Sequence, residues 1–467
     1  MIARIKSWDR RERATAIGIA VVTVMGFIAA FSGVEMAGTK TGAVLALVCI
    51  LGVPLLYAAI VRPILFPFAV YAFLTPFDTL LVFSQIGTLS KLLGLLTAAA
   101  ILFFMLRTRR FGEPPRAVVL WILFYLWATA SAWWAIDAPS ALDLLQTSWA
   151  LLALFLVVSM FRIDLARLRL AAFAVMAGGF AAATYGLYFF HSDAATIAAR
   201  GNRLWIENDT SQINPDHFAN ALILPLSLAL VGTLWSRGLA ARLFCGVSLV
   251  AMLVALVLSS SRGAALGLLA VIAYLLVRDR HRLQLAIFGG FAAGGVVAVT
   301  GATLLQRFAQ SLTTGGAGRV SIWQTGWAAL KENWMFGAGY GNFPFAYDRA
   351  YIHVFETFNA EWHRASHNIL LGTGVELGIV GLVLLIWAWV ATYRLLSPIG
   401  EDDPRHPIVL AVQAAIIGLF VAGMFADIMI TKYVWLAFIM SVMTYGVAPV
   451  ASRSTAFSPA AEAAVNA

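Results

Sequence analysis

The sequence predicts an all-α integral membrane protein, a polytopic bundle of about 12–14 transmembrane helices. Hydrophobic residues make up 61% of the 467 residues and charged residues only 12%, about half the charged share of an ordinary soluble domain. The mean hydropathy is +0.85, and the charges stand in short clusters between long apolar runs. Because so few charges cannot cover a water-facing surface, we expect lipid to surround most of the chain.

Each apolar run is expected to form a helix, because unpaired backbone groups are not tolerated in hydrocarbon and the alternation typical of a β-barrel is not visible. One run, 64–83, contains prolines and is either a span or a re-entrant segment. The predicted runs are residues 14–32, 42–60, 64–83, 90–106, 117–135, 142–160, 169–190, 217–235, 243–258, 263–277, 283–303, 367–392, 408–426 and 431–449.

Arginine-rich clusters set the predicted orientation. If every run crosses the membrane, each cluster falls in an alternate loop, and the positive-inside rule places these loops in the cytoplasm. Both termini are then cytoplasmic, and the first helix is expected to stay uncleaved. The clusters lie at residues 4–13, 62, 107–110, 162–169, 237–242, 278–282, 394–405 and 453.

Two outward-facing loops are long enough to carry function, residues 191–216 and residues 304–366. We therefore expect an N-terminal transmembrane bundle (1–303), a large outward loop (304–366), C-terminal transmembrane helices (367–449) and a disordered cytoplasmic tail (450–467).

The large loop contains an aromatic stripe at helical spacing. Trp323, Trp327, Leu330 and Trp334 are predicted to share one face of a short helix, while Thr325 and other polar residues point elsewhere. This pattern predicts an amphipathic helix that lies on the membrane surface or caps the bundle.

No nucleic-acid, nucleotide or metal site is predicted. The net charge of +9 comes from the loop clusters, which is typical of topology rather than of a groove for phosphates. Cys49 and Cys245 lie in separate apolar runs, which favours neither a disulfide nor a metal site. The glycine-rich residues 337–341 follow no strand, so we expect a tight turn rather than a dinucleotide site. No cofactor is expected.

Arg262 follows three serines, Ser259 to Ser261, in a polar notch between two short apolar runs. An unpaired arginine at that depth costs on the order of 3 kcal/mol or more. One interpretation is a hairpin tip whose arginine reaches toward water. The favoured interpretation is an anion site, assisted by the serine hydroxyls and by the N-terminus of the helix that begins at Gly263.

Two other outward segments carry candidate residues. Arg200 and Arg203 precede a helix start at Asn214-Pro215, which suits an N-cap, and they are either solvated or functional. His367 lies at the outward end of a long apolar helix that carries Glu376 about two and a half turns later. Because a helix N-terminus disfavours a protonated imidazole, His367 is a candidate general base; the alternative is a structural histidine.

Taken together, these segments resemble the O-antigen ligase/polymerase superfamily of bacterial envelope glycosyltransferases. The resemblance covers about residues 200–385, and the first 190 residues match only in being transmembrane. Residues 214–220 fit a weaker pattern, in which Asp216 and His217 stand in place of the more usual asparagine. The motifs are Ser259–Gly263, Gly318-Arg319-x-x-x-Trp323, Gly337-x-Gly339-x-Gly341-Asn342-Phe343, and His367-Asn368 with Glu376-x-Gly378-x-x-Gly381-Leu382.

The resemblance implies an inverting, metal-independent glycosyltransferase on the periplasmic face of the bacterial inner membrane. It would move a glycan from undecaprenyl diphosphate to an acceptor hydroxyl. Arg203 and Arg262 would grip the diphosphate, and His367 would activate the acceptor. Arginine forks can stabilise such a leaving group without a metal. The residues expected to bind the diphosphate and the glycan around them are Arg200, Arg319, Ser261, Trp323 and Asn368.

The motifs do not determine the identity of the acceptor. Ligases of this superfamily use lipid A–core, O-antigen or exopolysaccharide polymerases use a second lipid-linked glycan, and a third branch uses a protein hydroxyl. We expect an O-antigen ligase, with a repeat-unit polymerase as the alternative. A lipid or solute transporter is a more distant alternative, with Asp78 and Asp427 as its candidate ionisable residues.

Overall fold

The computed structural model describes residues 52, 55–80, 82–83, 87–192, 203–207, 212–287, 289–290, 319–354 and 362–447. The predicted run 14–32, most of the runs 42–60 and 283–303, and the predicted tail lie outside these residues. The described chain is helical apart from its turns and two short antiparallel ribbons, which confirms the all-α fold. The ribbons pair β1 (Val82–Phe83) with β2 (Gly87–Thr88) and β3 (Ile206–Glu207) with β4 (Gln212–Ile213).

Eight helices of the described chain are long and apolar enough to cross a membrane, so the chain is a multi-pass membrane protein. Two shorter helices, α13 (Arg262–Arg278) and α19 (Lys432–Tyr445), pack among them. The eight are α5 (Leu89–Thr108), α6 with η3 (Arg116–Trp133), α7 (Ala138–Ser159), α8 (Leu165–Ser192), α10 with α11 (Pro215–Trp235), α12 (Leu239–Leu258), α17 (Ile369–Arg394) and α18 (His406–Gly423).

The proline-bearing run at 64–83 is bent rather than straight. It forms η1 (Ile64–Phe68), α4 (Ala69–Leu74) and η2 (Thr75–Leu80), and Pro67 lies inside η1. The apolar pieces Leu55–Val61 and Ile64–Asp78 meet at 114°. Arg62 and Pro63 lie between these two pieces. Since a proline removes a helical hydrogen bond and clashes with the preceding turn, the bend at this point makes the run a broken span or a re-entrant segment.

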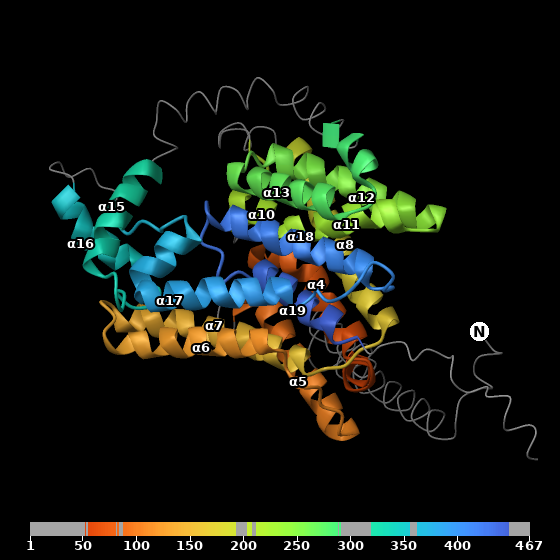
Figure 1. Cartoon of the computed structure of the whole chain (residues 1–467), viewed down its shortest axis with the longest axis horizontal. Coiled ribbons are helices and arrows are strands. Elements are labelled where there is room, and N and C mark those ends of the chain that lie inside the picture. The colour runs from red at the N-terminus through yellow and green to blue at the C-terminus, as the bar shows by residue number, and fades with distance from the viewer. Residues whose placement is uncertain are drawn as a thin grey trace, which may run out of the picture.

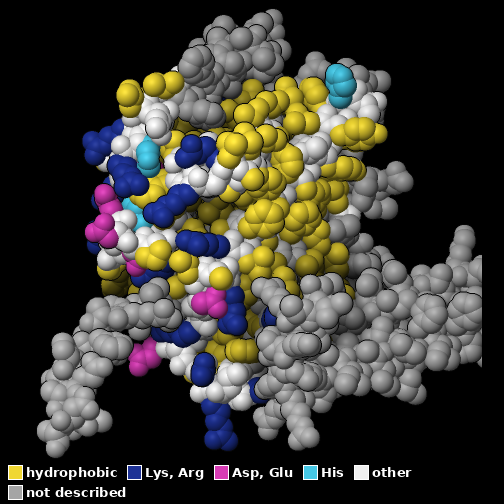
Figure 2. Space-filling view, turned by 90° about the vertical axis from the view of Figure 1, so that its right-hand side faces the viewer, with side chains coloured by type: hydrophobic (Ala, Val, Ile, Leu, Met, Phe, Trp, Pro, Cys, Tyr) yellow, Lys and Arg dark blue, Asp and Glu magenta, His cyan; other side chains and the backbone are white. Residues whose placement is uncertain are grey.

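Loops that carry basic clusters meet at one end of the bundle. Arg162 donates a hydrogen bond to the Glu113 carbonyl at 3.2 Å, and Arg405 donates to the carbonyls of Thr444 and Val447 at 3.2 and 3.3 Å. Figure 2 views the molecule from the side opposite α15 (Arg319–Glu332) and α16 (Phe343–Val354), and shows Lys and Arg side chains gathered beside a broad hydrophobic area. This arrangement agrees with the predicted alternation of basic loops.

One face of α12 carries a stripe of exposed apolar side chains, as expected for a helix in contact with lipid. Its exposed apolar residues recur every three or four positions and form a continuous stripe, as a lipid-facing helix requires. They are Leu239, Leu243, Val247, Val250 and Val254.

The described part of the large loop contains two helices, α15 and α16, and α15 covers the tryptophan stripe that was predicted to be helical. Helices α15 and α16 pack together at one end of the bundle, against the first turns of α17 (Figure 1). Helix α15 buries Ile322, Thr325, Gly326 and Ala329, whereas Trp327 is 57% exposed. The packed face carries small residues that allow a close approach, since a Cβ on Gly326 would lie 2.9 Å from a Leu371 methyl.

The glycine-rich residues 337–341 form the predicted tight turn, which docks on a break in α17. Gly337, Gly339 and Gly341 have φ values of +81°, +104° and +72°, in the left-handed region that favours glycine. Inside α17, Gly378 also has a positive φ of 64°. The amides of Ala338 and Gly339 donate to the carbonyls of Val375 and Glu376 at 2.8 and 2.9 Å, so the turn and the broken helix hold each other.

Candidate functional site

Two predicted arginines, distant in the sequence, converge on one carboxylate. Arg203 lies just before β3, Asp216 lies in the first turn of α10 (Pro215–Ala221), and Arg319 begins α15. Asp216 accepts from Arg203 Nη2 at 2.8 Å and contacts Arg319 Nη2 at 3.5 Å. Arg203 Nε also donates to the Ser259 carbonyl at 2.9 Å. The first long outward loop, the serine-arginine notch and the large loop therefore meet at Asp216.

Arg262 and Ser261 belong to the same cluster. Ser261 is the N-cap of α13: its hydroxyl accepts from the Ala264 amide at 3.4 Å and lies in hydrogen-bonding reach of Asp216. Arg262 is the next residue. Burial lowers the pKa of the Arg319 guanidinium below its ordinary value, Asp216 opposes this shift, and Arg262 and Arg203 add to it. The three guanidinium groups thus lie within electrostatic reach of one another, and arginine stays charged even so.

His367 lies beside a second carboxylate, Asp427. The His367 backbone amide donates to Asp427 Oδ2 at 2.9 Å, and the imidazole Nδ1 lies 3.9 Å from that oxygen. The Ser366 hydroxyl donates to Asp427 Oδ1. Asn368 follows as the N-cap of α17, where its side-chain oxygen accepts from the amides of Leu370 and Leu371, both at 3.0 Å. Asn368 is thus engaged in starting the helix that presents His367.

His217 connects the arginine cluster to the His367 cluster. Its Nδ1 lies 3.0 Å from the Tyr433 hydroxyl, and it is within electrostatic reach of Asp216, Asp427 and His367. The sequence analysis did not assign His217, Tyr433 or Asp427 to the site. The available signal was the unusual Asp216-His217 pair at the helix start, together with the position of Asp427 at the outward end of its apolar run.

Trp323 reaches the His367 cluster from α15. Its indole Nε1 donates to the Ser366 carbonyl at 3.2 Å, and its ring lies 6.3 Å from that of Phe425. Of the predicted site residues, the structure brings Arg203, Arg262, Ser261 and Arg319 into one cluster, and His367, Asn368 and Trp323 into its neighbour. Arg200 lies outside the described residues.

A comparison with protein families gives a match over part of the chain. Residues 247–386 match the family described as O-antigen ligase, and the match spans Arg262, Arg319 and His367. This match supports the resemblance of the chain to the O-antigen ligase/polymerase superfamily. No curated protein matches the chain. The matched family implies a glycosyltransferase-like enzyme of the O-antigen ligase/polymerase group, with lipid-linked glycans in general as its substrates.

The O-antigen ligase match leaves several neighbouring residues unassigned. Arg203, Asp216, His217 and Asp427 lie outside the matched segment, but the fold places them against residues within it. Among the described residues, no group of three or more His, Cys, Asp or Glu side chains is arranged to hold a metal ion.

Asp78, one of the two carboxylates considered for a transporter, has a cationic partner. Lys432 Nζ lies 2.5 Å from Asp78 Oδ1 and 2.7 Å from the Thr88 hydroxyl. The pair joins η2 to the start of α19, one residue before Tyr433. Asp78 is therefore explained by packing at the outward end of the bundle.

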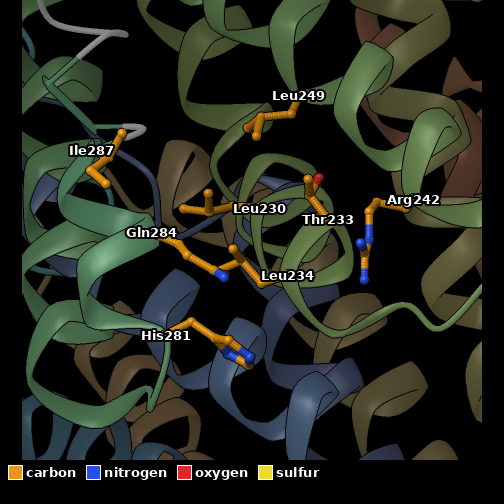
Figure 3. A pocket seen from close by; sticks show the side chains of 8 residues that line it. All are labelled: Leu230, Thr233, Leu234, Arg242, Leu249, His281, Gln284 and Ile287. Atoms are coloured by element: carbon orange, nitrogen blue, oxygen red, sulfur yellow. The ribbon is translucent and has the colours of Figure 1, made fainter. Parts of the chain in front are cut away.

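Two cavities differ in their relation to this site. A cavity of about 190 Å³ borders Asp427 and Ser366. A larger one, of about 530 Å³, lies near the far end of α13, where Arg242, His281 and Gln284 surround leucine side chains (Figure 3). Helix α13 has 17 residues, so the far cavity is separated from Arg262 by roughly 25 Å of helix. Only the smaller cavity adjoins the site.

Proposed function

We propose that this protein transfers a glycan from undecaprenyl diphosphate to an acceptor hydroxyl in one inverting step that needs no metal, as an O-antigen ligase with lipid A–core as acceptor. One observation carries the proposal: the cluster of Arg203, Arg262 and Arg319 adjoins the pair formed by His367 and Asp427. A cationic anion-binding group beside a candidate base is what displacement of a diphosphate requires.

The charge balance of the arginine cluster suits a diphosphate. The guanidinium groups of Arg203 and Arg319 contact one carboxylate, Asp216, and Arg262 lies within electrostatic reach of Arg319. The arginines at this point therefore outnumber the carboxylate that Arg203 and Arg319 share. A diphosphate joined to a lipid and a sugar carries two negative charges. Guanidinium groups bind such oxygens through paired, charge-assisted hydrogen bonds, so they would stabilise the charge that develops as the diphosphate leaves.

His367 would take the proton of the acceptor hydroxyl. As the acceptor oxygen bonds to the anomeric carbon, the bond from that carbon to the diphosphate oxygen breaks, and configuration inverts. Asp427 would orient the imidazole; the 3.9 Å separation between Nδ1 and Oδ2 is one that a bound substrate can shorten, since catalytic hydrogen bonds often tighten only in the complex.

The basic loops support a periplasmic site. They meet at the opposite end of α12, α13 and α17 from Arg203, Arg262 and His367. By the positive-inside rule, this end faces the cytoplasm of a bacterial inner membrane. Both termini would then be cytoplasmic, and the site would face the periplasm.

Reconstituted protein tests the proposal. In proteoliposomes that contain a diphosphate-linked glycan and purified lipid A–core, we expect transfer by the wild type in the presence of EDTA. Arg203→Ala, Arg262→Ala and His367→Ala should each lose at least about 100-fold, whereas Arg242→Ala, at the far cavity, should retain activity. Wild-type rates in all three site variants would overturn the assignment.

The same assay identifies the acceptor. With lipid A–core omitted and lipid-linked repeats supplied alone, a ligase should form no product, whereas a repeat-unit polymerase should form longer lipid-linked chains. Product from lipid A–core would establish the ligase.

A further inference from the structure

The smaller cavity combines polar groups with aromatic walls directly beside the His367 cluster. It lies between α17, the turn at 339–343 and residues 427–430. Glu376, Thr373, Ser366 and Asp427 supply oxygen atoms, and Tyr340 and Phe343 supply ring surfaces. Its volume of about 190 Å³ is below the ~300–1,000 Å³ of pockets for drug-sized ligands, so one sugar ring, rather than an oligosaccharide, matches its size.

The cavity is separate from the arginine cluster. It shares Asp427 and Ser366 with the surroundings of His367, but Arg203, Arg262 and Arg319 are not among its lining residues. In a one-step displacement, nucleophile and leaving group occupy opposite faces of the anomeric carbon. The acceptor therefore needs a place that borders the base and lies apart from the groups that hold the diphosphate, and this cavity meets both conditions.

The polar groups of the cavity select a neutral, hydroxylated ligand. Glu376 Oε1 accepts from the Phe343 amide at 3.3 Å, and the Gly341 amide also reaches this carboxylate. The carboxyl group has more hydrogen-bonding positions than these two amides occupy, so positions are left for ligand hydroxyls. Asp427 also lines the cavity and disfavours a phosphate group there. Aromatic walls beside a carboxylate suit the apolar face and the hydroxyl edge of a pyranose.

We propose that this cavity binds the terminal sugar of the acceptor, with Glu376 and Thr373 holding its hydroxyls so that one of them reaches His367. The proposal rests on the proposed function and refines it, because it makes the acceptor a sugar hydroxyl rather than a protein hydroxyl. The acceptor proton passes to His367, the acceptor oxygen bonds to the anomeric carbon, and the diphosphate departs with the electron pair of the broken bond.

Two substitutions test the cavity without removing the catalytic groups. Glu376→Gln keeps an acceptor oxygen for the Phe343 amide but replaces the second carboxyl oxygen by an amide nitrogen, and Thr373→Val keeps the shape but loses the hydroxyl. We expect each to raise the KM for the glycan acceptor about 10-fold or more, with the KM for the donor and the kcat at saturating acceptor changed less than about threefold. Glu332→Gln, on an exposed position of α15, and Thr108→Val, at the far end of α5, are matched controls that should change neither constant.

Calorimetric titration with soluble core oligosaccharide separates this proposal from the proposed function, because it measures acceptor binding without turnover. Wild-type protein should bind the oligosaccharide and Glu376→Gln should bind it at least 10-fold more weakly, even if no diphosphate-linked donor is consumed. Equal affinity in wild type and both variants, a rise in the donor KM instead, or transfer to serine peptides that is unaffected by both substitutions would overturn the acceptor assignment. Loss of transfer with normal oligosaccharide binding would instead count against the proposed function alone.

Discussion

The backbone amide of His367 donates to Asp427 at 2.9 Å, and the imidazole Nδ1 of His367 lies 3.9 Å from the same carboxylate oxygen. His367 also has a positive φ of 47°, a conformation that is uncommon for a residue with a side chain and that persists where the surroundings hold it. The Ser366 hydroxyl donates to the other oxygen of Asp427. One carboxylate therefore fixes both the backbone and the surroundings of the candidate base.

Asp427→Asn should slow glycan transfer without preventing folding. Asparagine can still accept from the His367 amide, but it no longer supplies the negative charge that would orient and stabilise the imidazole when it takes a proton. We expect kcat to fall by about 100-fold with little change in KM for the donor. Asp348→Asn is a matched control. Asp348 also pairs with a histidine, His363, at 2.6 Å, but this pair lies in the large loop and outside the site. An Asp427→Asn enzyme as fast as the control would exclude this role.

Arg203→Lys should fail to replace arginine although the charge is kept. Arg203 uses two nitrogens at once, Nε toward the Ser259 carbonyl and Nη2 toward Asp216, and a lysine ammonium cannot reproduce this planar fork. We expect the KM for the diphosphate donor to rise at least about 10-fold. Steady-state kinetics against donor concentration would measure it. A lysine variant with wild-type donor KM would show that charge alone is sufficient at this position.

Much of the architecture follows from the sequence, because helical spans depend on composition and run length. The start of α10 at Pro215, with Asn214 as N-cap, and the tight turn at residues 337–341 are confirmed for similarly local reasons. A re-entrant segment was predicted as one alternative for the proline-bearing run 64–83, and the bend next to Pro63 leaves that alternative and a broken span. Each of these features is encoded within a few consecutive residues.

The site itself depends on contacts that the sequence does not display. Asp216 was interpreted as part of a helix start and Asp427 as a weak transporter candidate, because nothing local shows that one meets Arg203 and Arg319 and the other meets His367. The packed face of α15 depends on tertiary contacts in the same way. The tryptophan stripe predicted an amphipathic helix, but only the structure shows that Gly326 and Ala329 belong to its buried face.

Gly378→Ala should destabilise the protein more than an ordinary substitution. Gly378 has φ 64° and ψ −165°, a region nearly exclusive to glycine, and a Cβ there would lie 2.2 Å from the Met335 carbonyl oxygen. We expect a loss of at least about 1–3 kcal/mol and a lower thermal unfolding midpoint in detergent. Gly400→Ala, where a Cβ would meet nothing within 4 Å, should leave the midpoint unchanged. Equal midpoints for the two variants would contradict the strained break in α17.

We expect Asp403 to stabilise the folded protein less in strong acid than at neutral pH. Hydrogen bonds from the Arg405 side chain, at 2.9 and 2.7 Å, hold the pKa of Asp403 below its ordinary value of 3.8. Because the folded pKa is the lower one, the stabilisation is complete above about pH 4–5 and is lost as pH falls through the folded value. The difference in unfolding midpoint between wild type and Asp403→Asn should therefore be constant from pH 7 to pH 5 and shrink in stronger acid. A difference that grows on acidification would have the wrong sign.

The docking of the 337–341 turn on the broken α17 has a mechanical consequence. Besides the amides of Ala338 and Gly339, the amide of Ile379 donates to the Trp334 carbonyl at 2.8 Å, and the Trp127 indole donates at 2.9 Å to the Leu377 carbonyl, next to the break. Helices α15 and α17 should then move as one rigid unit. Spin labels at the exposed positions Val320 and Val383 should report the same separation in resting and substrate-loaded protein. Any movement that admits a long polymer to His367 should then involve other segments that shift relative to this unit, and not a change inside the unit.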